Sequence, residues 1–319
     1  MKEVRHRLLK KKILSLPGCS VVRGLVITPL RAYFRYFPLR AGKTFLWSQV
    51  AEHLWWLETR TTCHTYFGSP LDVDARDGCG RFIYYFGVWE PTLTEMVERR
   101  LKPGDCFVDV GDNVGYFSLL GSKLVGHSGK VVSIEAVPRT FAILRKNLNA
   151  NGAENVRALN VAAWDKEETL TFFVSLDTID STSTGLPSLA QERGLTEQCS
   201  VHAAPLSLLL RPDEIVGARL IKIDIEGGER NVVAGLGPIL QGGRKDLEIV
   251  VEVSIDAFDE IVGFFREHGF FAYHLENDYK AKSYVNRQEM KRLRRVEAAP
   301  VHETQLDLVF SRINADFLP

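Results

Sequence analysis

The stretch from Phe107 to Ser118, FVDVGDNVGYFS, decides the fold. It opens with an apolar run broken by one acid, Asp109, as expected of a buried strand in a parallel sheet. Gly111 and Gly115 follow, and apolar residues then recur at helical spacing. A strand, a glycine turn and a helix form the first unit of a nucleotide-binding α/β fold, which binds its ligand at the carboxyl ends of the strands. Asp109 is therefore expected close to a ligand.

The spacing of the turn narrows the choice of ligand. A dinucleotide-binding turn has the pattern G-x-G-x-x-G, in which the middle glycine lets the backbone approach a pyrophosphate. Here the pattern is D-x-G-x-N-x-G, with Asn113 where that middle glycine would be. This turn is compatible with a ligand that carries no phosphate, such as S-adenosylmethionine. A nicotinamide-dependent oxidoreductase is the alternative, because the same strand, turn and helix could serve it.

Length and composition indicate a soluble globular protein. The chain of 319 residues can form one sizeable domain and an extension, and 45% of its residues are hydrophobic. Forty basic residues balance forty acidic ones, so we expect no nucleic-acid partner. The five cysteines form no C-x-x-C pair, which is typical of reduced thiols in a cytoplasmic protein. No apolar run approaches the roughly 18 residues of a membrane span.

Three regions are expected along the chain. Residues 1–60 are basic and aromatic-rich and are predicted to be mainly helical. We favour a helix that packs on the main domain; a substrate lid or a peripheral membrane contact is the alternative, because arginines alternate with aromatic residues there. Residues 61–104 are predicted to form a small β-rich lead-in, with Phe82–Phe86 as one strand, and a helix. Residues 105–319 are expected to form the main domain.

In the main domain, strands and helices alternate with short connections, which predicts a mostly parallel sheet covered by helices on both faces. Seven strands are expected, at residues 107–110, 131–134, 156–161, 220–225, 247–253, 270–274 and 306–310. Asp177–Gly194 is rich in Ser, Thr and Gly and is predicted to be a mobile loop that could close over a substrate. The basic segment Tyr279–Val296 is predicted to be a solvated helical face.

The ends of the second and third strands carry candidate ligand contacts. Glu135 closes the second strand, where such a sheet keeps an acid that accepts hydrogen bonds from ribose hydroxyls. The alternative for Glu135 is an acid that merely faces water. At the third strand, the small Ala163 would let backbone groups reach an adenine edge. Trp164 either stacks on the ring or, as the preferred interpretation, packs in the core.

A second informative stretch, KIDIEGG, begins at Lys222. Its apolar strand runs into Asp224 and Glu226, which are expected at the carboxyl edge of the sheet. A carboxylate there could stabilise a cationic sulfonium, orient an acceptor or take its proton. The alternative for Glu226 is a place in the first turn of the next helix, where it complements the helix dipole. Glu252 ends the fifth strand and with Asp224 could hold Mg²⁺, although we favour metal-free chemistry.

Five stretches together resemble the FkbM-type methyltransferases: FVDVGDNVGYFS, SIEAVPRTFAILRKNL, VAAWDKEETLTFF, IKIDIEGGERNVVAGL and EIVVEVS. The resemblance covers roughly Phe86 to Gly269. The family consists of class I enzymes that depend on S-adenosylmethionine. It implies a class I methyltransferase Rossmann-like sheet of about seven strands. It also implies methyl transfer, commonly to an oxygen of a sugar, lipid or secondary metabolite.

The resemblance also implies roles for single residues. It places five of them around the cofactor: Asp109, Gly111, Asn113, Gly115 and Glu135. Three further candidates for cofactor contacts are Tyr116, Ala163 and Trp164. On the acceptor side, Asp224 is the first candidate for the base that takes the acceptor's proton, and Glu226 is the second. Both lie at the acidic strand end of the family pattern.

Two positions depart from the family pattern. Asp112 stands where the family usually has alanine, which adds a charge near the methionine end of the pocket. Ala136 follows Glu135 where a proline is usual, which could shift the ribose contact slightly. The expected acceptor is a small molecule, glycan or lipid. Besides the oxidoreductase, a catalytically inactive methyltransferase fold that serves as a binding protein is the remaining alternative.

Overall fold

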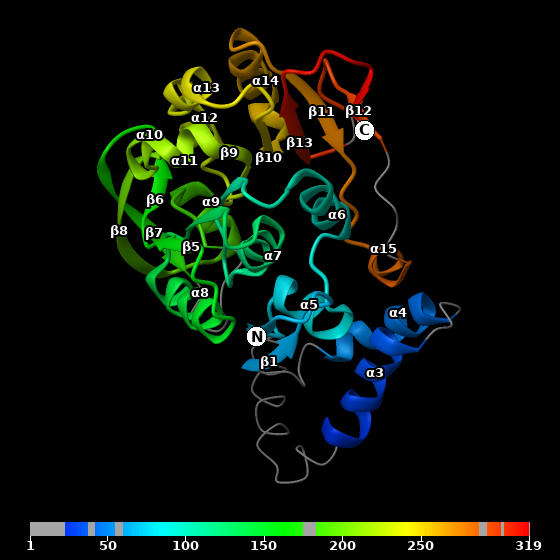
Figure 1. Ribbon diagram of the computed structural model, residues 1–319. Helices are drawn as coiled ribbons and strands as arrows, with labels where there is room; N and C mark the ends of the chain where they lie inside the picture. The colour runs from blue at the N-terminus through cyan, green and yellow to red at the C-terminus, as the bar shows by residue number, and fades with distance from the viewer. Residues whose placement is uncertain are drawn as a thin grey trace. The chain divides into compact units, whose positions relative to one another are not determined.

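The chain folds into two compact units (Figure 1). The computed structural model describes residues 23–37, 42–54, 60–174, 183–286, 292–300 and 303–318. The N-terminal unit contains Met1–Pro91 and Tyr279–Gln288, and the sheet unit contains Thr92–Asp278 and Glu289–Pro319. A late segment of the chain therefore belongs with its beginning.

Aromatic side chains hold the N-terminal unit together. Its elements are η1 (Arg23–Ile27), α3 (Thr28–Tyr36), α4 (Lys43–Leu54), the antiparallel strands β1 (Arg60–His64) and β2 (Pro70–Asp74), α5 (Gly78–Phe86) and α15 (Ala281–Asn286). The ring of Trp47 in α4 lies 4.8 Å from that of Phe86 in α5. Tyr284 of α15 stacks on Phe82, with centroids 4.1 Å apart, and Figure 1 shows α15 in orange beside α4 in blue. Such aromatic pairs add roughly 0.5–1.5 kcal/mol each beyond the burial of their surface.

The segment Phe82–Phe86 is helical, so the predicted strand there is wrong. The carboxylate of Asp77 accepts a hydrogen bond from the Gly80 amide and caps the start of α5. Gly87, with a φ of +78°, ends the helix. The run of aromatic residues is typical of a strand by composition, but the two caps select the helix.

The described part of residues 1–60 is mainly helical and exposes several large apolar side chains. They are Leu25, Val26, Tyr36, Phe37 and Phe45. No helix in the described residues is long and apolar enough to cross a membrane. Neither observation tests whether this segment acts as a substrate lid or contacts a membrane surface, so both stay predictions.

The sheet unit contains one large mixed sheet, nine-stranded within the described residues. Five neighbouring strands are parallel, in the order β5 (Val156–Leu159), β4 (Lys130–Ile134), β3 (Cys106–Val110), β9 (Ala218–Ile223) and β10 (Glu248–Ser254). The other four pair antiparallel, in the order β13 (Gln305–Ser311), β11 (Phe271–Leu275), β12 (Leu293–Arg295) and β14 (Phe317–Leu318). All seven predicted strands are present, and β12 and β14 extend one edge. The predicted α/β fold is confirmed.

Helices cover both faces of this sheet. A smaller, three-stranded sheet is formed by the residues between β5 and β9. The helices are α6 (Pro91–Arg100), α7 (Tyr116–Val125), α8 (Pro138–Ala150), α9 (Pro187–Arg193), α10 (Leu206–Leu209), α11 (Pro212–Gly217), α12 (Glu229–Ala234), α13 (Gly237–Gly242), η2 (Ile255–Ala257) and α14 (Phe258–Glu267). The smaller sheet has the order β6 (Ala162–Trp164), β8 (Glu197–Pro205), β7 (Glu168–Val174). This arrangement agrees with the predicted alternation of strands and helices.

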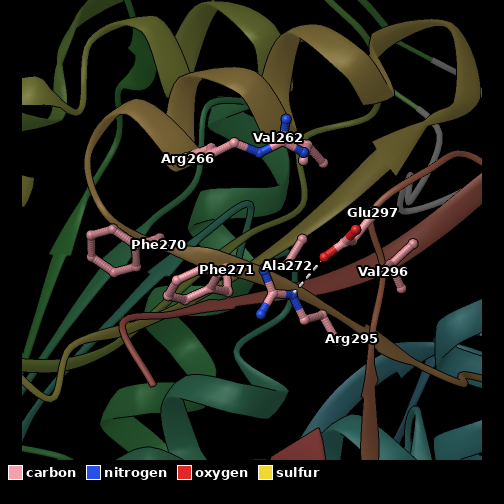
Figure 2. Close-up of a pocket in the computed structure, with 8 residues that line it drawn as sticks. All are labelled: Val262, Arg266, Phe270, Phe271, Ala272, Arg295, Val296 and Glu297. Carbon is pink, nitrogen blue, oxygen red and sulfur yellow. Dashed lines mark ion pairs between the residues drawn. The ribbon is translucent and has the colours of Figure 1, made fainter. Parts of the chain in front are cut away.

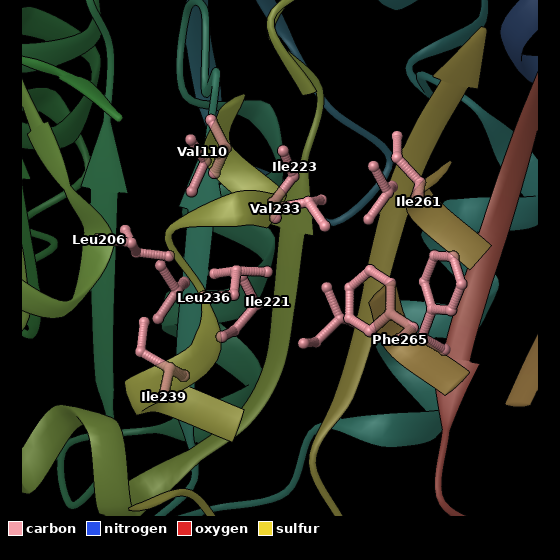
Figure 3. Packing of buried hydrophobic residues seen from close by; sticks show 14 of the residues in the cluster. Val110, Leu206, Ile221, Ile223, Val233, Leu236, Ile239, Ile261 and Phe265 are labelled. Atoms are coloured by element: carbon pink, nitrogen blue, oxygen red, sulfur yellow. The ribbon is translucent and has the colours of Figure 1, made fainter. Parts of the chain in front are cut away.

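The main core lies on the face that α12, α13 and α14 cover. Figure 3 shows Ile221 and Ile223 of β9 packed among side chains such as Phe265 of α14 and Leu236, which lies between α12 and α13. The ring of Phe265 stacks on Phe310 of β13 at 3.8 Å. Because side chains alternate along a strand, the residue between the two isoleucines, Lys222, lies on the opposite face. The same alternation puts Asp109 on that opposite face.

The chain enters the large sheet in its middle. From β3 it runs outward to β4 and β5, and then returns to β9 on the other side of β3. Such a reversal marks the place where open α/β sheets bind their ligands. In the register, Asp109 lies opposite Lys222 and Val110 lies opposite Ile223. The two informative stretches of the sequence are therefore neighbours at the carboxyl edge.

Gly111 is required by this contact between the two stretches. Its φ is +81°, and a Cβ atom there would lie 1.8 Å from the carbonyl oxygen of Asp224. The Asp224 amide also donates a hydrogen bond to the Val110 carbonyl at 3.0 Å. The sequence suggests that this glycine makes room for a ligand, but the structure shows that it makes room for the backbone after β9.

Two further segments differ from their predicted structure. Asp177–Gly194 is predicted to be a loop, but Pro187–Arg193 forms α9, because a proline begins the helix and Gly194 ends it with a φ of +67°. Residues 177–182 of that predicted loop lie outside the described residues. Tyr279–Val296 is predicted to be one helical face, but it holds α15 and the strand β12.

We expect Gly111→Ala to destabilise the protein far more than Gly152→Ala. Gly152 also has a positive φ, +60°, but no atom lies within 4 Å of a Cβ placed there. Gly152→Ala should cost only the left-handed backbone penalty of about 1–2 kcal/mol. Gly111→Ala adds a backbone clash and should lower the free energy of unfolding by at least about 3 kcal/mol. Urea denaturation of both variants measures this, and equal losses would contradict our explanation of Gly111.

Candidate functional site

The turn after β3 and the end of β4 are joined by hydrogen bonds to Glu135. The Asn113 amide donates to Glu135 Oε2 at 3.0 Å, and the Val137 amide donates to Oε1 at 2.9 Å. Asn113 has a φ of +54°, a left-handed conformation that asparagine tolerates better than most residues. The structure thus brings together two residues that the sequence predicts to share one site.

Glu135 is almost fully buried, and its burial raises its pKa to about 7, although the two amide hydrogen bonds act in the opposite direction. A carboxylate has about four sites that can accept hydrogen bonds. Two of them are used by the protein backbone. Glu135 therefore keeps the capacity to accept hydrogen bonds from hydroxyl groups of a ligand.

Two aspartates of the turn form a second buried group. Asp109 is fully buried in β3, and Asp112 is 5% exposed. The Ser133 hydroxyl donates a hydrogen bond to the Asp112 carboxyl group. Burial and the adjacent charge of Asp109 raise the pKa of Asp112 well above its ordinary value. The sequence suggests that Asp112 adds a charge near the ligand. The surroundings of Asp112 instead favour its neutral, protonated form.

Lys222 connects the turn to the acids after β9. Its ammonium group is buried and lies 3.5 Å from Asp109 Oδ1 and 3.0 Å from Asp224 Oδ2. The same nitrogen lies 5.3 Å from the centre of the Phe117 ring. We predicted no role for Lys222 from the sequence. A lysine inside an otherwise apolar strand is the signal that could have pointed to it, since a buried lysine is rarely without a partner.

Glu226 lies in the connection after β9, in the left-handed conformation with a φ of +61°. Its Oε2 accepts a hydrogen bond from Arg193 of α9 at 2.7 Å. Burial, followed by the charge of Asp224, raises the pKa of Glu226 to about 7, and Arg193 opposes this. The helix α12 begins only at Glu229, whose carboxylate accepts from the Gly227 amide at 3.0 Å. The alternative that Glu226 lies in the first turn of the next helix is therefore wrong. The acid in the first turn of α12 is Glu229.

The remaining predicted contacts are packed in the protein. Ala163 is buried in the main core, and Trp164 lies against Gly228, where an added Cβ would be 2.7 Å from the indole ring. Tyr116 is buried, with its hydroxyl 3.3 Å from that of Thr94. These contacts agree with the core-packing interpretation of Trp164. A contact of these three residues with a cofactor stays a prediction.

We also predicted no role for Asp307 from the sequence. It lies in β13, directly opposite Glu252 of β10. Burial and then the charge of Asp224 raise the pKa of Asp307 to about 7. Its strand is antiparallel to β10, so its first residues reach the carboxyl edge of the parallel strands. An acid within an apolar strand was the available signal, but its place in the sheet could not be read from the sequence.

The described residues contain no group of three or more His, Cys, Asp or Glu side chains placed to hold a metal ion. Asp224 and Glu252, which we considered as magnesium ligands, are not joined by a third such side chain in that part of the chain.

A pocket of about 320 Å³ lies elsewhere in the sheet unit. Figure 2 shows it between α14, the start of β11 and the residues around Arg295, which pairs with Glu297. Leu275 at the end of β11 pairs with Asp307, so the pocket at Phe271 lies toward the opposite edge of the sheet. None of the predicted site residues lines it.

Comparison with known proteins supplies related sequences. Over 96 residues, the chain is 33% identical to a protein-L-isoaspartate O-methyltransferase of Methanococcus maripaludis, which covers 30% of this chain and 42% of that relative. Over 196 residues, it is 29% identical to the 31-O-demethyl-FK506 methyltransferase FkbM of Streptomyces tacrolimicus, covering 53% of this chain and 74% of that protein. The chain thus spans less than half the length of the isoaspartate methyltransferases that it matches.

The chain also aligns with a solved structure and matches a family profile. The structure is a methyltransferase FkbM from Methylobacillus flagellatus, with 12% identity, a TM-score of 0.37, and coverage of 73% of this chain and 55% of that one. The profile described as "Methyltransferase FkbM domain" matches residues 109–272, slightly more than half of the chain. That match contains the turn after β3, Glu135 and the acids after β9. The chain therefore belongs to the FkbM methyltransferase domain family.

Proposed function

We propose that this protein transfers a methyl group from S-adenosylmethionine to a hydroxyl oxygen of a sugar, lipid or secondary metabolite. The observation that carries the proposal is the shared edge of β3, β4 and β9. There the Asn113–Glu135 contact joins the turn after β3 to the end of β4, and Asp224 follows the end of β9, where Lys222 contacts both Asp109 and Asp224. The edge thus offers a place for a nucleoside beside a carboxylate for an acceptor. The names of both relatives reported above describe methyl transfer at oxygen.

The residues around the turn fit S-adenosylmethionine. Glu135 can accept hydrogen bonds from the ribose hydroxyls, as set out above. Asn113 Oδ1 is buried and accepts no hydrogen bond from the described residues, so it can take one from a ligand. Asp109 is buried beside this turn, with its Oδ1 3.5 Å from the Lys222 ammonium. When bound, S-adenosylmethionine supplies an electrophilic methyl group on its sulfonium.

The acids after β9 would act on the acceptor. Asp224 has 28% of its side chain exposed, and Lys222 holds one of its oxygens at 3.0 Å. We assign Asp224 to take the proton of the acceptor hydroxyl, with Glu226 as the second candidate. Glu226 pairs with Arg193 in the same way as Asp224 pairs with Lys222. Holding donor and acceptor in line can contribute roughly 7–11 kcal/mol to such a reaction.

We expect S-adenosylhomocysteine, but not NAD, to raise the melting temperature of the 319-residue chain. A nicotinamide-dependent oxidoreductase would give the reverse result. Incubation with methyl-labelled S-adenosylmethionine and cell extracts should then label a small molecule, glycan or lipid. Binding of S-adenosylhomocysteine without any labelled product would favour the inactive binding protein instead.

The affinity for S-adenosylhomocysteine should depend on pH through Glu135. The pKa of Glu135 is raised to about 7 in the folded protein, so the protonated form of this side chain predominates below that pH. The stability that protonated Glu135 contributes to the fold is lost as pH rises through about 7. Ribose hydroxyls donate best to the ionised form. The affinity should therefore increase by up to about tenfold between about pH 6 and pH 8. Calorimetry measures this, and Glu135→Gln should remove the dependence; a dependence that persists in this variant would refute the ribose role.

Asp224→Asn should lower kcat much more than it lowers cofactor affinity. Loss of a general base typically costs roughly 10²–10⁴-fold in rate. Asp213→Asn is the matched control, because Asp213 pairs with Lys130 at the exposed start of β4, away from the site. Asp213→Asn should leave kcat unchanged. Normal turnover in Asp224→Asn would reject the assignment.

A further inference from the structure

We propose that the chain between β7 and β8 positions Glu226 to bind the methyl acceptor, with Thr184 and Arg193 as the two positioning residues. This inference rests on the proposed function, because it assigns a further role on the acceptor side of the same site. We call residues 183–194, which include α9, the α9 segment. It contacts the connection after β9 at a backbone carbonyl, at a carboxylate and at a glycine.

The connection after β9 has an unusual backbone. Glu226 has a φ of +61°, and Gly227 after it has a φ of +103°. Glycine adopts such a conformation freely, but the Cβ atom of a glutamate crowds the backbone there. Strained residues of this kind persist only where the surrounding contacts hold them, and they cluster at functional sites. The contacts that hold Glu226 are therefore candidates for a functional role.

Thr184 holds the backbone at the strained residue. Its hydroxyl donates a hydrogen bond to the Glu226 carbonyl at 2.9 Å and accepts one from the Leu186 amide at 3.1 Å. Thr184 is fully buried, and its amide and carbonyl pair with the carbonyl and amide of Phe173 in β7 at 3.1 and 2.8 Å. One hydroxyl group thus ties the smaller sheet to the connection after β9.

The α9 segment also covers Gly227 and reaches the Glu226 side chain. A Cβ atom at Gly227 would lie 3.0 Å from Leu186 Cδ1 and 3.2 Å from Leu189 Cδ2, so the two leucines pack directly on this glycine. From the last turn of α9, Arg193 donates a hydrogen bond to Glu226 Oε2 at 2.7 Å. Both the main chain and the side chain of Glu226 are therefore fixed by this segment.

The fixed carboxylate keeps the capacity to bind a ligand. A carboxylate has about four sites that accept hydrogen bonds. Within the described residues, Arg193 donates to Glu226 Oε2 and no group donates to Oε1. The Glu226 side chain is 28% exposed, as is that of Asp224 two residues earlier. A hydrogen-bond donor of the acceptor molecule can therefore bind Glu226 while Asp224 takes the proton of the reacting hydroxyl.

Arg193 prepares Glu226 for this role in two ways. It opposes the rise that burial causes in the pKa of Glu226, and so favours the ionised form, which accepts hydrogen bonds best. It also holds the carboxylate in one place, which lowers the entropy cost of binding a ligand. None of the contacts described above involves the turn after β3 or Glu135. Their loss should weaken binding of the acceptor and leave binding of the cofactor unchanged.

The first test measures hydrogen exchange of the backbone amides from Asp224 to Glu229. Thr184→Val keeps the shape of the side chain but removes its hydroxyl, and it should speed this exchange roughly three- to tenfold, as expected for the loss of one hydrogen bond. Thr184→Ser keeps the hydroxyl and should behave as the wild-type chain does. Arg99→Gln is the control, because Arg99 pairs with Glu95 within α6. Unchanged exchange in Thr184→Val would overturn the proposal.

The second test follows methyl incorporation from labelled S-adenosylmethionine at increasing concentrations of cell extract, which separates the apparent KM for the acceptor from kcat. Arg193→Gln should raise this apparent KM about tenfold. Arg193→Lys keeps a charge that can pair with Glu226 and should recover part of the loss. Arg99→Gln should leave both constants unchanged. The rise in melting temperature with S-adenosylhomocysteine should be the same in all these variants.

A double-mutant cycle shows whether Arg193 acts through Glu226. In a Glu226→Gln background, Arg193→Gln should change the apparent KM by less than about twofold. Equal effects of Arg193→Gln with and without the Glu226 carboxylate would overturn the proposal, and so would a weaker melting shift with S-adenosylhomocysteine in Arg193→Gln. If the wild-type chain labels no molecule, the proposed function fails instead. Hydrogen exchange still judges the α9 segment in that case, since it needs no turnover.

Discussion

The close approach of two backbone segments, at Gly111 after β3 and at Asp224 after β9, is the constraint on which the candidate site depends. It holds the end of the first core strand against the strand to which the chain later returns. The core on one face fixes the register, because a slip of one residue would turn Ile221 and Ile223 away from the helices that cover them. Lys222 is thereby kept between Asp109 and Asp224.

The consequence is electrostatic. Alternation along the strands gathers ionisable groups on the face opposite the main core, with one buried lysine among several carboxylates. Because water is largely excluded, the pKa values of Glu135, Glu226 and Asp307 all rise to about 7. The net charge of the site therefore changes near neutral pH. Arg193 of α9 limits this change at Glu226, and the amides of Asn113 and Val137 limit it at Glu135.

The sequence predicts this fold well where structure depends on local pattern. The apolar strands, the turn at Gly111 and the pairing of that turn with Glu135 were all readable, because spacing alone brings strand ends to one edge. The helix at Phe82–Phe86 was misassigned because its aromatic composition suits a strand and only the caps at Asp77 and Gly87 decide. Lys222 and Asp307 were missed for another reason. Each is a charged residue within an apolar strand, but its neighbours lie on strands distant in the sequence, and the place of antiparallel β13 beside β10 cannot be read from local pattern.

The chain passes between the two units three times. The backbone leaves the N-terminal unit after Pro91, returns to it for Tyr279–Gln288, and then goes back to complete the large sheet. Tyr284 supplies a ring that Phe82 stacks upon, although about two hundred residues separate them along the chain. A protein shortened to begin at Thr92 would keep this tyrosine but lose its aromatic neighbours. A single cut in the chain therefore cannot release either unit whole.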